Sequence, residues 1–193
     1  MPWEKQFDVE EARQAALTVF WTRGYDNTSM PDLLEAMGIQ RGSFYDTFKS
    51  KHHALIDALL RYDSGRRRTF VSASSAGKSP KQVIGSLFSA VAAEAASESG
   101  RRGCFLVNCA LELAPRDPAV AAVVNRAFDE TRAFFRSMIE KDQQTGEIPC
   151  RIDPEGAAQA LLGLLLGMRV LARAGAEQSA VEAIAVQAQA LLA

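Results

Sequence analysis

The sequence predicts an all-α protein with about nine helices, three short ones at the N-terminus and longer ones after them. Apolar residues recur at spacings of three and four along most of the 193-residue chain, and this is the helical period. No stretch alternates convincingly with the period of two that a half-buried strand requires. A helix-capping residue followed by proline, a combination typical of helix starts, occurs at Ser79-Pro80, Asp117-Pro118 and Asp153-Pro154.

The first helix is expected to begin after Asp8 and to end at Gly24. An aspartate side chain can accept hydrogen bonds from the first backbone N–H groups of a helix. Apolar residues then follow at helical spacing as far as Phe20. Glycine is common just past a helix end, because it adopts the left-handed conformation without strain.

A second and a third short helix are expected on either side of Gly38. Thr28 is a suitable N-cap for a helix over residues 29–37, and Pro31 falls in its first turn, where a missing N–H costs little. Gly38 can supply the left-handed turn that ends this helix. The third helix is then expected close to Arg41–Phe48.

The remaining helices are predicted from their caps and from one break in the pattern. Ser50 can cap a long fourth helix that runs to about Val71. Residues 72–79 are small and polar, which is the composition of a linker. Five further helices are expected over residues 80–98, 104–113, 118–143, 154–174 and 177–192.

Two short helices joined through Gly38 and packed on a first helix form a helix-turn-helix unit, which many DNA-binding proteins use. Phe44 and Phe48, four residues apart, give the third helix one apolar face. The polar residues around its outward faces and its N-terminal end are therefore free to contact DNA. The DNA-binding candidates are Thr28, Gln40, Arg41, Gly42, Ser43, Tyr45, Thr47 and Lys51.

Some of these candidates are suited to base edges. Arg41 can donate two hydrogen bonds to guanine O6 and N7, and Gln40 or Ser43 can donate or accept. Gly42 has no side chain, so it lets the end of the helix approach a base edge closely. We expect these residues to contribute to sequence preference.

Other candidates are suited to phosphates. Tyr45 and Lys51 are placed for phosphate contact, and Thr28 stands at a helix N-terminus whose amides favour an anion. The chain has a net charge of −1, but between Arg41 and Arg68 seven basic residues stand against three acidic ones. A local positive face of this kind suffices for phosphate contact.

The same residues resemble a known family signature. The stretches GYDNTSM (residues 24–30) and MGIQRGSFYDTFKSK (residues 37–51) are similar to the N-terminal signature of the TetR family of bacterial transcriptional regulators. The GY–TS turn, the RGSFY core and the F-x-S-K exit all stand at the family's spacing. Two residues depart from it. Gln40 replaces a small N-cap, and Asp46 stands where an aromatic or basic residue is common.

The resemblance implies two domains and a mechanism. Residues 1–50 would form a helix-turn-helix DNA-binding domain. Residues 51–193 would form a helical domain that binds a ligand and dimerises through its last two long helices. The protein would then be a homodimeric repressor that binds a palindromic operator in double-stranded DNA. A small-molecule or electrophile effector would release it.

The termini and cysteines of the chain indicate a cytoplasmic location. The first seven residues, MPWEKQF, contain no basic segment followed by an apolar run, so no signal peptide is expected. The strongly apolar stretch Ala157–Leu166 is too short to span a bilayer, so we expect a buried helix and no membrane partner. Three cysteines without an export signal indicate reduced thiols.

Cys104 is the most distinctive candidate for sensing an effector. It opens a predicted helix directly after Arg101-Arg102-Gly103, and cations and a helix N-terminus both favour the thiolate over the thiol. Together with the G-x-x-x-x-x-R stretch Gly167–Arg173, this setting is similar to that in an electrophile-sensing member of the TetR family. That member carries lysine at the place of Arg173.

An apolar pocket is the other candidate for an effector site. Phe88, Phe128 and Met168 are expected to line it, since cavities between helices are common binding sites. Asn108 is a further candidate, because it lies four residues before Glu112 on an otherwise apolar helix. A satisfied buried hydrogen bond is the commoner role for such a residue.

Other functions have less support. A helical carrier or scavenger of small molecules that no longer binds DNA is the alternative, supported by Asp46 and the mild overall charge. No nucleophile–base pair or phosphate-cradling loop occurs in the pattern, so we expect no enzyme, cofactor or metal. His52 and His53 are adjacent and face different directions on a helix, which prevents chelation. The run Arg66-Arg67-Arg68 is expected to be solvated.

Overall fold

The computed structural model describes residues 7–74 and 77–193, and over these residues the chain forms ten α-helices and no strand. The all-α class is confirmed. The helices are α1 (Val9–Arg23), α2 (Met30–Met37), α3 (Arg41–Phe48), α4 (Lys51–Ser74), α5 (Pro80–Glu94), α6 (Glu98–Arg102), α7 (Phe105–Glu112), α8 (Pro118–Thr145), α9 (Pro154–Arg173) and α10 (Gln178–Ala190).

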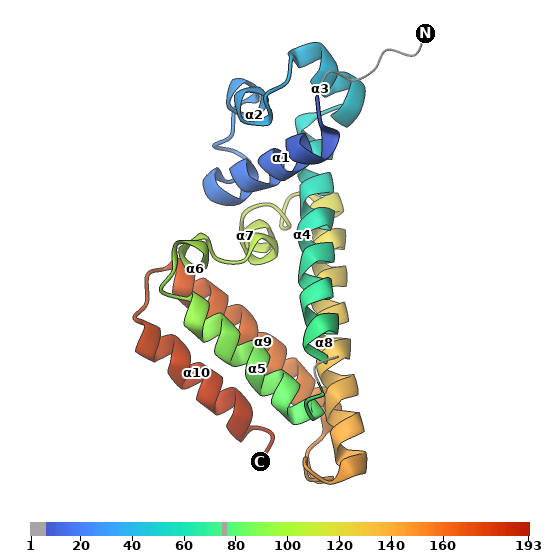
Figure 1. Ribbon diagram of the computed structural model, residues 1–193, viewed down its shortest axis with the longest axis vertical. Helices are drawn as coiled ribbons and strands as arrows, with labels where there is room; N and C mark the ends of the chain where they lie inside the picture. The colour runs from blue at the N-terminus through green and yellow to red at the C-terminus, as the bar shows by residue number, and fades with distance from the viewer. Residues whose placement is uncertain (1–6, 75–76) are drawn as a thin grey trace.

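The helices are arranged around two long parallel columns (Figure 1). α4 and α8 lie side by side along the length of the molecule, and α1 to α3 pack at one end of α4. α5, α9 and α10 form a layer that lies obliquely against α8. α6 and α7 lie between this layer and α1. The first three helices thus join the rest of the protein mainly through α4, against which α7 also packs.

The helix starts that the sequence predicts are confirmed at most positions. Asp8 accepts hydrogen bonds from the N–H groups of Glu10 and Glu11 at 2.7 and 3.2 Å. Ser79, Asp117 and Asp153 cap α5, α8 and α9, each with proline in the first turn. Each of these side chains satisfies backbone donors that a helix start otherwise leaves unpaired.

The cap of α2 differs from the prediction. Ser29 caps this helix and forms a reciprocal capping box with Asp32. Thr28 is fully buried instead, and its Oγ1 donates to the Gly24 carbonyl oxygen at 2.6 Å. The capping box satisfies two backbone groups at once, so it outcompetes a single threonine cap one residue earlier. Gly38 ends the helix in the left-handed conformation, with φ of 64°, as predicted.

The predicted helix over residues 80–98 is too long. α5 ends at Glu94, and a separate five-residue helix, α6, begins after Ser97, whose Oγ accepts from the Gly100 N–H at 3.0 Å. A Cβ at Gly100 would lie 2.2 Å from the Glu94 carbonyl oxygen, so the reversal requires glycine there. This extra short helix explains why the described residues contain ten helices and not about nine.

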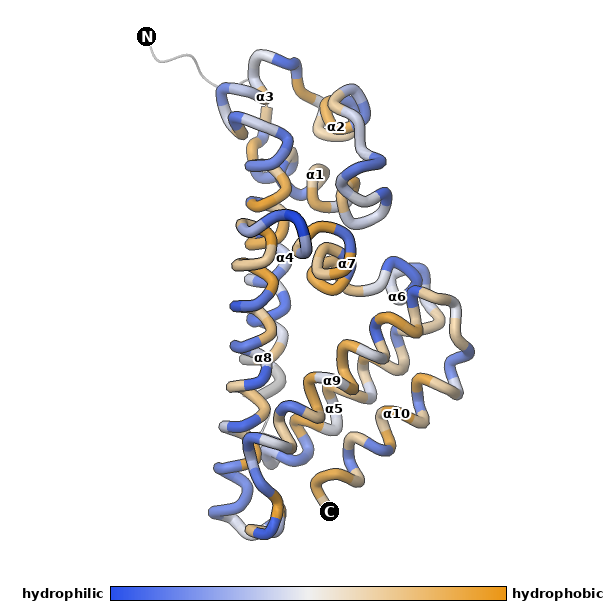
Figure 2. The backbone as a smooth tube through the Cα atoms, turned by 180° about the vertical axis from the view of Figure 1, so that it is seen from behind, coloured by the Kyte–Doolittle hydropathy of each residue, from blue (hydrophilic) through white to orange (hydrophobic). Residues whose placement is uncertain are grey.

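The buried apolar side chains form two clusters. The first joins α1, α2 and α3 to the start of α4 and to α7; it includes Phe20, Phe44 and Leu59. The second lies between α5, α8, α9 and α10 and includes Phe135. Figure 2 shows α4 and α8 alternating between hydrophilic and hydrophobic residues along their length, as expected for helices that bury one face. The first cluster continues past residue 50 into α4, so the domain boundary at that residue stays a prediction.

α9 has nearly the bounds that the sequence predicts, but the whole helix, unlike its stretch Ala157–Leu166, is long enough and apolar enough to meet the criteria for a membrane span. An 18-residue window of this 20-residue helix has a mean hydropathy of 1.3, which is enough by length and composition to cross a membrane. Core helices of soluble proteins pass the same test. Six of its residues, including Leu161 and Met168, are buried among α5, α8 and α10, and most of the rest of the helix is exposed.

Candidate nucleic-acid interface and central cavity

α3 presents one buried apolar face and an outward polar face. Phe44 and Phe48 are buried, and their rings stack with centroids 5.4 Å apart. Tyr45 meets Phe44 edge-on at 5.3 Å and remains 40% exposed. The two phenylalanines anchor the helix to the first core cluster, and Tyr45 and Asp46 between them point away from the core.

The N-terminal end of α3 is open. Gln40 stands at the N-cap position, but its side chain makes no capping hydrogen bond. Gln40, Arg41 and Gly42 are all exposed, and a Cβ placed on Gly42 would meet nothing within 4 Å. The guanidinium of Arg41 lies 5.7 Å from the ring centroid of Tyr45. The first backbone N–H groups of the helix therefore face outward together with three polar or small residues.

The other predicted DNA contacts are less accessible. Ser43 and Thr47 are partly buried, and the Thr47 Oγ1 atom is buried with no hydrogen-bond partner. Thr28 uses its hydroxyl internally, and its N–H donates to the Tyr25 carbonyl oxygen. The Nζ of Lys51 lies 4.2 Å from the ring centroid of Tyr25. Desolvation lowers the pKa of Lys51, against the opposing charges of nearby acids.

A set of polar contacts joins the turn between α1 and α2 to the start of α8. Arg116 forms an ion pair with Asp26, and Glu112 accepts from the Asp26 N–H at 3.3 Å. His52, at the start of α4, contacts Asp117 with 2.7 Å between Nε2 and Oδ2. These contacts fix the first helices to the α7–α8 connection. Over the described residues, no group of three or more potential ligands is placed to hold a metal ion.

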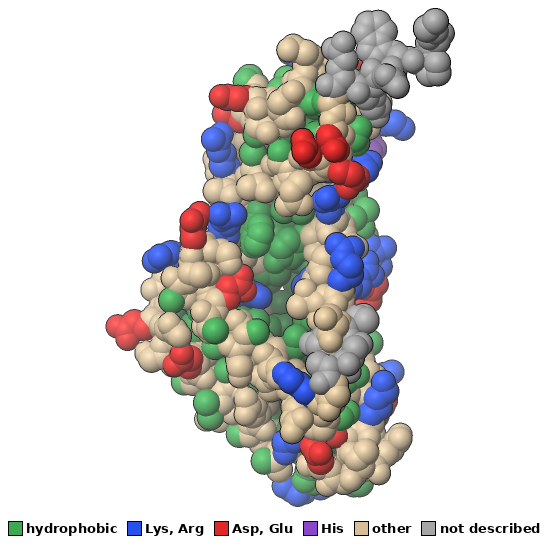
Figure 3. All heavy atoms as spheres, viewed as in Figure 1, with side chains coloured by type: hydrophobic (Ala, Val, Ile, Leu, Met, Phe, Trp, Pro, Cys, Tyr) green, Lys and Arg blue, Asp and Glu red, His purple; other side chains and the backbone are tan. Residues whose placement is uncertain are grey.

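A cavity of about 500 Å³ lies between the first helices and the oblique layer. We call it the central cavity. Figure 3 shows it as a hollow with hydrophobic side chains at its floor and basic side chains along its α4 edge. Six helices and the residue before α7 contribute to its wall. The lining residues are Gln14, Leu17, Trp21, Arg61, Tyr62, Gly65, Arg66, Arg68, Thr69, Phe70, Leu87, Ala90, Val91, Glu94, Cys104, Leu106, Phe128, Thr131, Leu162, Leu165, Leu166 and Arg169.

Arg66 is fixed inside the wall, which corrects the expectation that its arginine run is solvated. Its side chain is 18% exposed, and it donates to Thr131 Oγ1 at 2.6 Å and to Asp63 at 2.8 Å. Its guanidinium also lies 5.1 Å from the ring centroid of Phe70. Asp63 is fully buried and also pairs with Arg67 at 3.1 Å. The charge of this buried aspartate holds Arg66 in the wall, whereas Arg67 is only partly buried and Arg68 is exposed, as expected for a solvated run.

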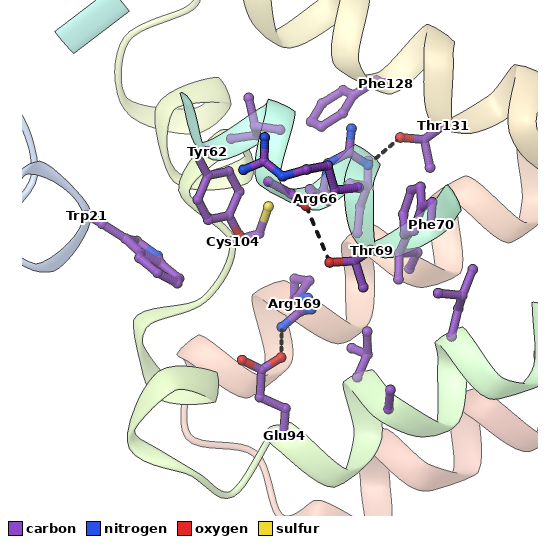
Figure 4. Close-up of a pocket in the computed structure, with 18 of the residues that line it drawn as sticks. Trp21, Tyr62, Arg66, Thr69, Phe70, Glu94, Cys104, Phe128, Thr131 and Arg169 are labelled. Atoms are coloured by element: carbon purple, nitrogen blue, oxygen red, sulfur yellow. Dashed lines mark hydrogen bonds and ion pairs between the residues drawn. The ribbon is translucent and has the colours of Figure 1, made fainter. Parts of the chain in front are cut away.

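A second ion pair crosses the cavity wall between α5 and α9 (Figure 4). Arg169 donates to Glu94 at 2.7 Å, and Ser99 also donates to this carboxylate. Burial raises the pKa of Glu94, but these two hydrogen bonds outweigh it and leave the pKa below its usual value. Burial lowers the pKa of Arg169, but the hydrogen bond to Glu94 and the charges of Glu94 and other neighbours together outweigh it and leave the pKa raised. Both groups are therefore charged at neutral pH.

Cys104 lies where the cavity wall meets α1. It is 7% exposed, and it stands at the N-cap position of α7. Desolvation, more than the neighbouring Cys104, raises the pKa of Tyr62 well above its usual value. Trp21 lies edge-on to Tyr62 at 5.1 Å, and its indole N–H donates to the Gly103 carbonyl oxygen at 3.1 Å. The cysteine is thus one residue from a direct link to α1.

The structure separates the residues predicted for an effector site. Cys104 and Phe128 line the central cavity. Phe88 and Met168 do not, because both are fully buried in the second cluster. Asn108 lies outside the lining and donates to the Arg102 carbonyl oxygen at 3.0 Å, the satisfied hydrogen bond that is common for such a residue.

Sequence reasoning missed the polar residues of the wall. Tyr62 and Arg66 continue the inward spacing of Leu59, and Arg169 continues that of Leu162 and Leu165. A charged residue on a buried helical stripe is a signal of a built polar site. That signal was available in the sequence, whereas the contribution of α1 to the wall was not, because it depends on how α1 packs against α4 and α7.

Comparison with protein families identifies both halves of the chain. A model described as "Tetracyclin repressor-like, C-terminal domain" matches residues 80–188, more than half of the chain. A model described as "Bacterial regulatory proteins, tetR family" matches residues 13–59, which contain α2 and α3.

Individual relatives and solved structures agree with these matches. The chain is 30% identical over 141 residues to the HTH-type transcriptional regulator YezE of Bacillus subtilis, covering 72% of this chain and 73% of that one. It is 29% identical over 173 residues to the HTH-type transcriptional repressor ComR of Escherichia coli, with coverage of 89% and 82%. A cysteine mutant of the TetR family regulator CifR, solved with 26-base-pair operator DNA, matches at 27% identity with a TM-score of 0.87, covering 98% of each chain.

Proposed function

The chain belongs to the TetR family of bacterial regulatory proteins and is a DNA-binding transcriptional regulator. From this premise we propose that it is a cytoplasmic repressor that binds a palindromic operator as a homodimer. An effector in the central cavity, or an electrophile that modifies Cys104, releases it. The observation that carries the proposal is the outward face of α3, where Arg41, Gly42 and Tyr45 are exposed over a buried phenylalanine pair.

The contacts on DNA follow from the exposure of each group. Arg41 is the candidate for bidentate hydrogen bonds to guanine, with Gln40 and Ser43 beside it. Tyr45 and the open N-terminal amides of α3 are suited to phosphate oxygens. Lys51 can reach a phosphate by leaving the Tyr25 ring. Thr28 would support the turn before α2 and leave phosphate contact to the neighbouring Ser29.

The homodimer forms through the exposed face of α9 and α10. Val170 is 42% exposed and Val186 is 62% exposed, and the residues around them are mostly small or apolar. A Cβ placed on Gly163 or Gly167 would meet nothing within 4 Å, so another helix can approach α9 closely there. A second copy of the same face is self-complementary and pairs the two α3 helices about a two-fold axis. This occupant also accounts for the apolar character of α9 without a membrane.

Release of DNA follows from the wall that α1 contributes to the central cavity. Leu17 and Trp21 lie on α1, in the same unit as α3, and both line the cavity. An occupant that favours a different position of α1 therefore shifts α3 as well. Trp21 also bonds to the Gly103 carbonyl, next to Cys104. A bulky adduct on this thiol therefore also shifts α1 and releases DNA.

A salt-titrated mobility-shift assay on random-sequence DNA tests DNA binding itself. We expect wild-type protein to bind, with the logarithm of the association constant falling linearly with the logarithm of salt concentration. The double variant R41A/Y45A should lose most of this binding, and Arg101→Ala, an exposed arginine far from α3, should keep it. No binding by the folded wild-type protein would favour the alternative, a carrier or scavenger that uses only the cavity.

A further inference from the structure

We propose that the effector of the central cavity is a small organic anion, a carboxylate or similar acid carried on an apolar body. The inference rests on the proposed function in taking this cavity as the effector site. Its basis is the balance of hydrogen-bond donors, acceptors and charges in the wall.

The cavity wall holds more donors than its own acceptors use. Arg169 makes one hydrogen bond, to Glu94, and its other N–H groups have no protein partner among the described residues. The Nε atom of Arg66 is buried and has no hydrogen-bond partner. An arginine carries five N–H donors in a fixed fork. The buried Nε of Arg66 is a costly unpaired donor, and Arg169, which lines the cavity, has N–H groups free to donate to an occupant that brings acceptors.

The acceptors in the wall are already engaged. Glu94 accepts from Arg169 and from Ser99, one donor on each carboxylate oxygen. Thr131 Oγ1 accepts from Arg66 at 2.6 Å and donates to the Ala127 carbonyl oxygen at 2.7 Å. A ligand that carries donors would therefore meet acceptors that already hold a partner, whereas a ligand that carries acceptors meets donors that hold none.

The charge of the lining favours an anion, as its excess of hydrogen-bond donors does. Its ionised side chains are four arginines and one glutamate. Arg61 pairs with Glu10, and Arg68 bonds to the Ser64 hydroxyl, which carries no charge. The lining thus keeps a positive excess even after its ion pairs are counted. Such a field attracts anions and repels cations.

The rest of the lining indicates that the body of the ligand is apolar. Leu87, Val91, Phe128 and Leu165 line the same cavity as the two guanidiniums and give it apolar surface. A volume of about 500 Å³ accommodates a molecule larger than acetate or phosphate. A carboxylate can accept two parallel hydrogen bonds from one guanidinium while its hydrocarbon part packs on the apolar wall. This combination distinguishes an amphipathic organic acid from an inorganic anion.

Calorimetric titration of the full-length protein without DNA tests the proposal. The probes are octanoate, decanoate, phenylacetate and naphthoate, each paired with its primary amide, and inorganic phosphate. We expect at least one acid to bind at one site per protomer and to bind about tenfold more tightly than its amide. Inorganic phosphate should not compete. The proposal is overturned if no acid in the panel binds, or if the amides bind as tightly as the acids.

Matched variants assign the preference to the cavity. Arg169→Met should remove the preference for acid over amide. Arg169→Lys, which keeps the charge without the fork, should retain a weakened preference. Arg173→Met, one turn further along α9 and outside the lining, should leave it unchanged. Loss of the preference in Arg173→Met, or its survival in folded Arg169→Met, would overturn the assignment. If acids bind in this way but do not release operator DNA, the proposed release mechanism fails and the anion site stands.

Discussion

The outward face of α3 and the wall of the central cavity both carry arginines, but the surroundings of these arginines are opposite. Arg41 is exposed, and its one described contact is with the ring of Tyr45. Arg66 is mostly buried and is held by Asp63 and Thr131. The polar groups of α3 therefore keep their hydrogen-bonding capacity for DNA, whereas those of the cavity also hold helices together. A substitution on α3 should change binding alone, and one in the cavity wall should also change stability.

Asp63→Ala should have the largest effect on stability. Asp63 is fully buried and is shared by Arg66 and Arg67, so its loss removes the buried counter-charge of two guanidiniums. We expect the free energy of unfolding to fall by about 3–5 kcal/mol, measured by urea denaturation. Glu130→Ala removes a more exposed partner of Arg67 and should cost about 1 kcal/mol or less. If the two variants lose equal free energy of unfolding, the claim that buried charges of the cavity wall hold the helices together is wrong.

Substitution of the two open glycines of α9 should have the next largest effect. Gly163→Leu and Gly167→Leu insert bulk into the proposed dimer face, at about 1–3 kcal/mol for each overpacked site. Analytical ultracentrifugation should show a weaker dimer, and operator affinity should fall with it. Ala133→Leu adds the same bulk to an exposed position on α8 and should change neither. A monomer that binds its site with full affinity would refute the two-fold arrangement.

Arg41→Ala should change DNA affinity without changing stability. We expect a loss of about 1–3 kcal/mol on the preferred site and a relaxed base preference at one position in each half-site. The free energy of unfolding should stay within about 0.5 kcal/mol of wild type. Lys51→Ala should instead weaken all sequences alike and reduce the salt slope by about one unit. If Lys51→Ala alters the selected sequence and Arg41→Ala does not, the proposed orientation of α3 is wrong.

The smallest of the expected effects is a difference in alkylation rate among the three cysteines. Cys104 lines the cavity, Cys109 is buried beside it, and Cys150 is exposed. Burial raises the pKa of Cys109 to about 12, so almost none of this thiol is ionised at neutral pH and its alkylation should be slowest. Electrophile sensing requires Cys104 to react faster than Cys150 in single-cysteine variants. It also requires Cys104→Ser to retain operator DNA after electrophile treatment. Failure of either result would leave the cavity ligand as the trigger.

The two regions also differ in how far the sequence alone could describe them. The buried pair Phe44 and Phe48 and the exposed Tyr45 lie within one helix, so helical spacing predicts their placement correctly, whereas Thr47, predicted to face outward, is partly buried. Thr28 was misplaced because Ser29 offers a two-bond capping box one residue later. That choice between adjacent caps depends on Asp32, three residues further along the chain.

The cavity depends on contacts that no local pattern contains. Phe88 and Met168 have the composition expected of pocket residues, yet both lie in the second core cluster. Trp21 lines the cavity because of how α1 packs in the fold. Its hydrogen-bond partner, Gly103, lies 82 residues further along the chain. Spacing could have identified Arg66 and Arg169 as inward-facing, but their partners come from other helices and required the fold.

Selection of bound DNA from a random pool by the wild-type protein tests the central claim most directly. The account predicts a pseudo-palindromic site, because two identical α3 helices related by a two-fold axis contact equivalent half-sites. The half-site centres should lie about 34–36 Å apart, or somewhat more, which is one turn of the DNA helix or slightly longer. An asymmetric site, or no enrichment of any sequence by folded protein, would contradict it.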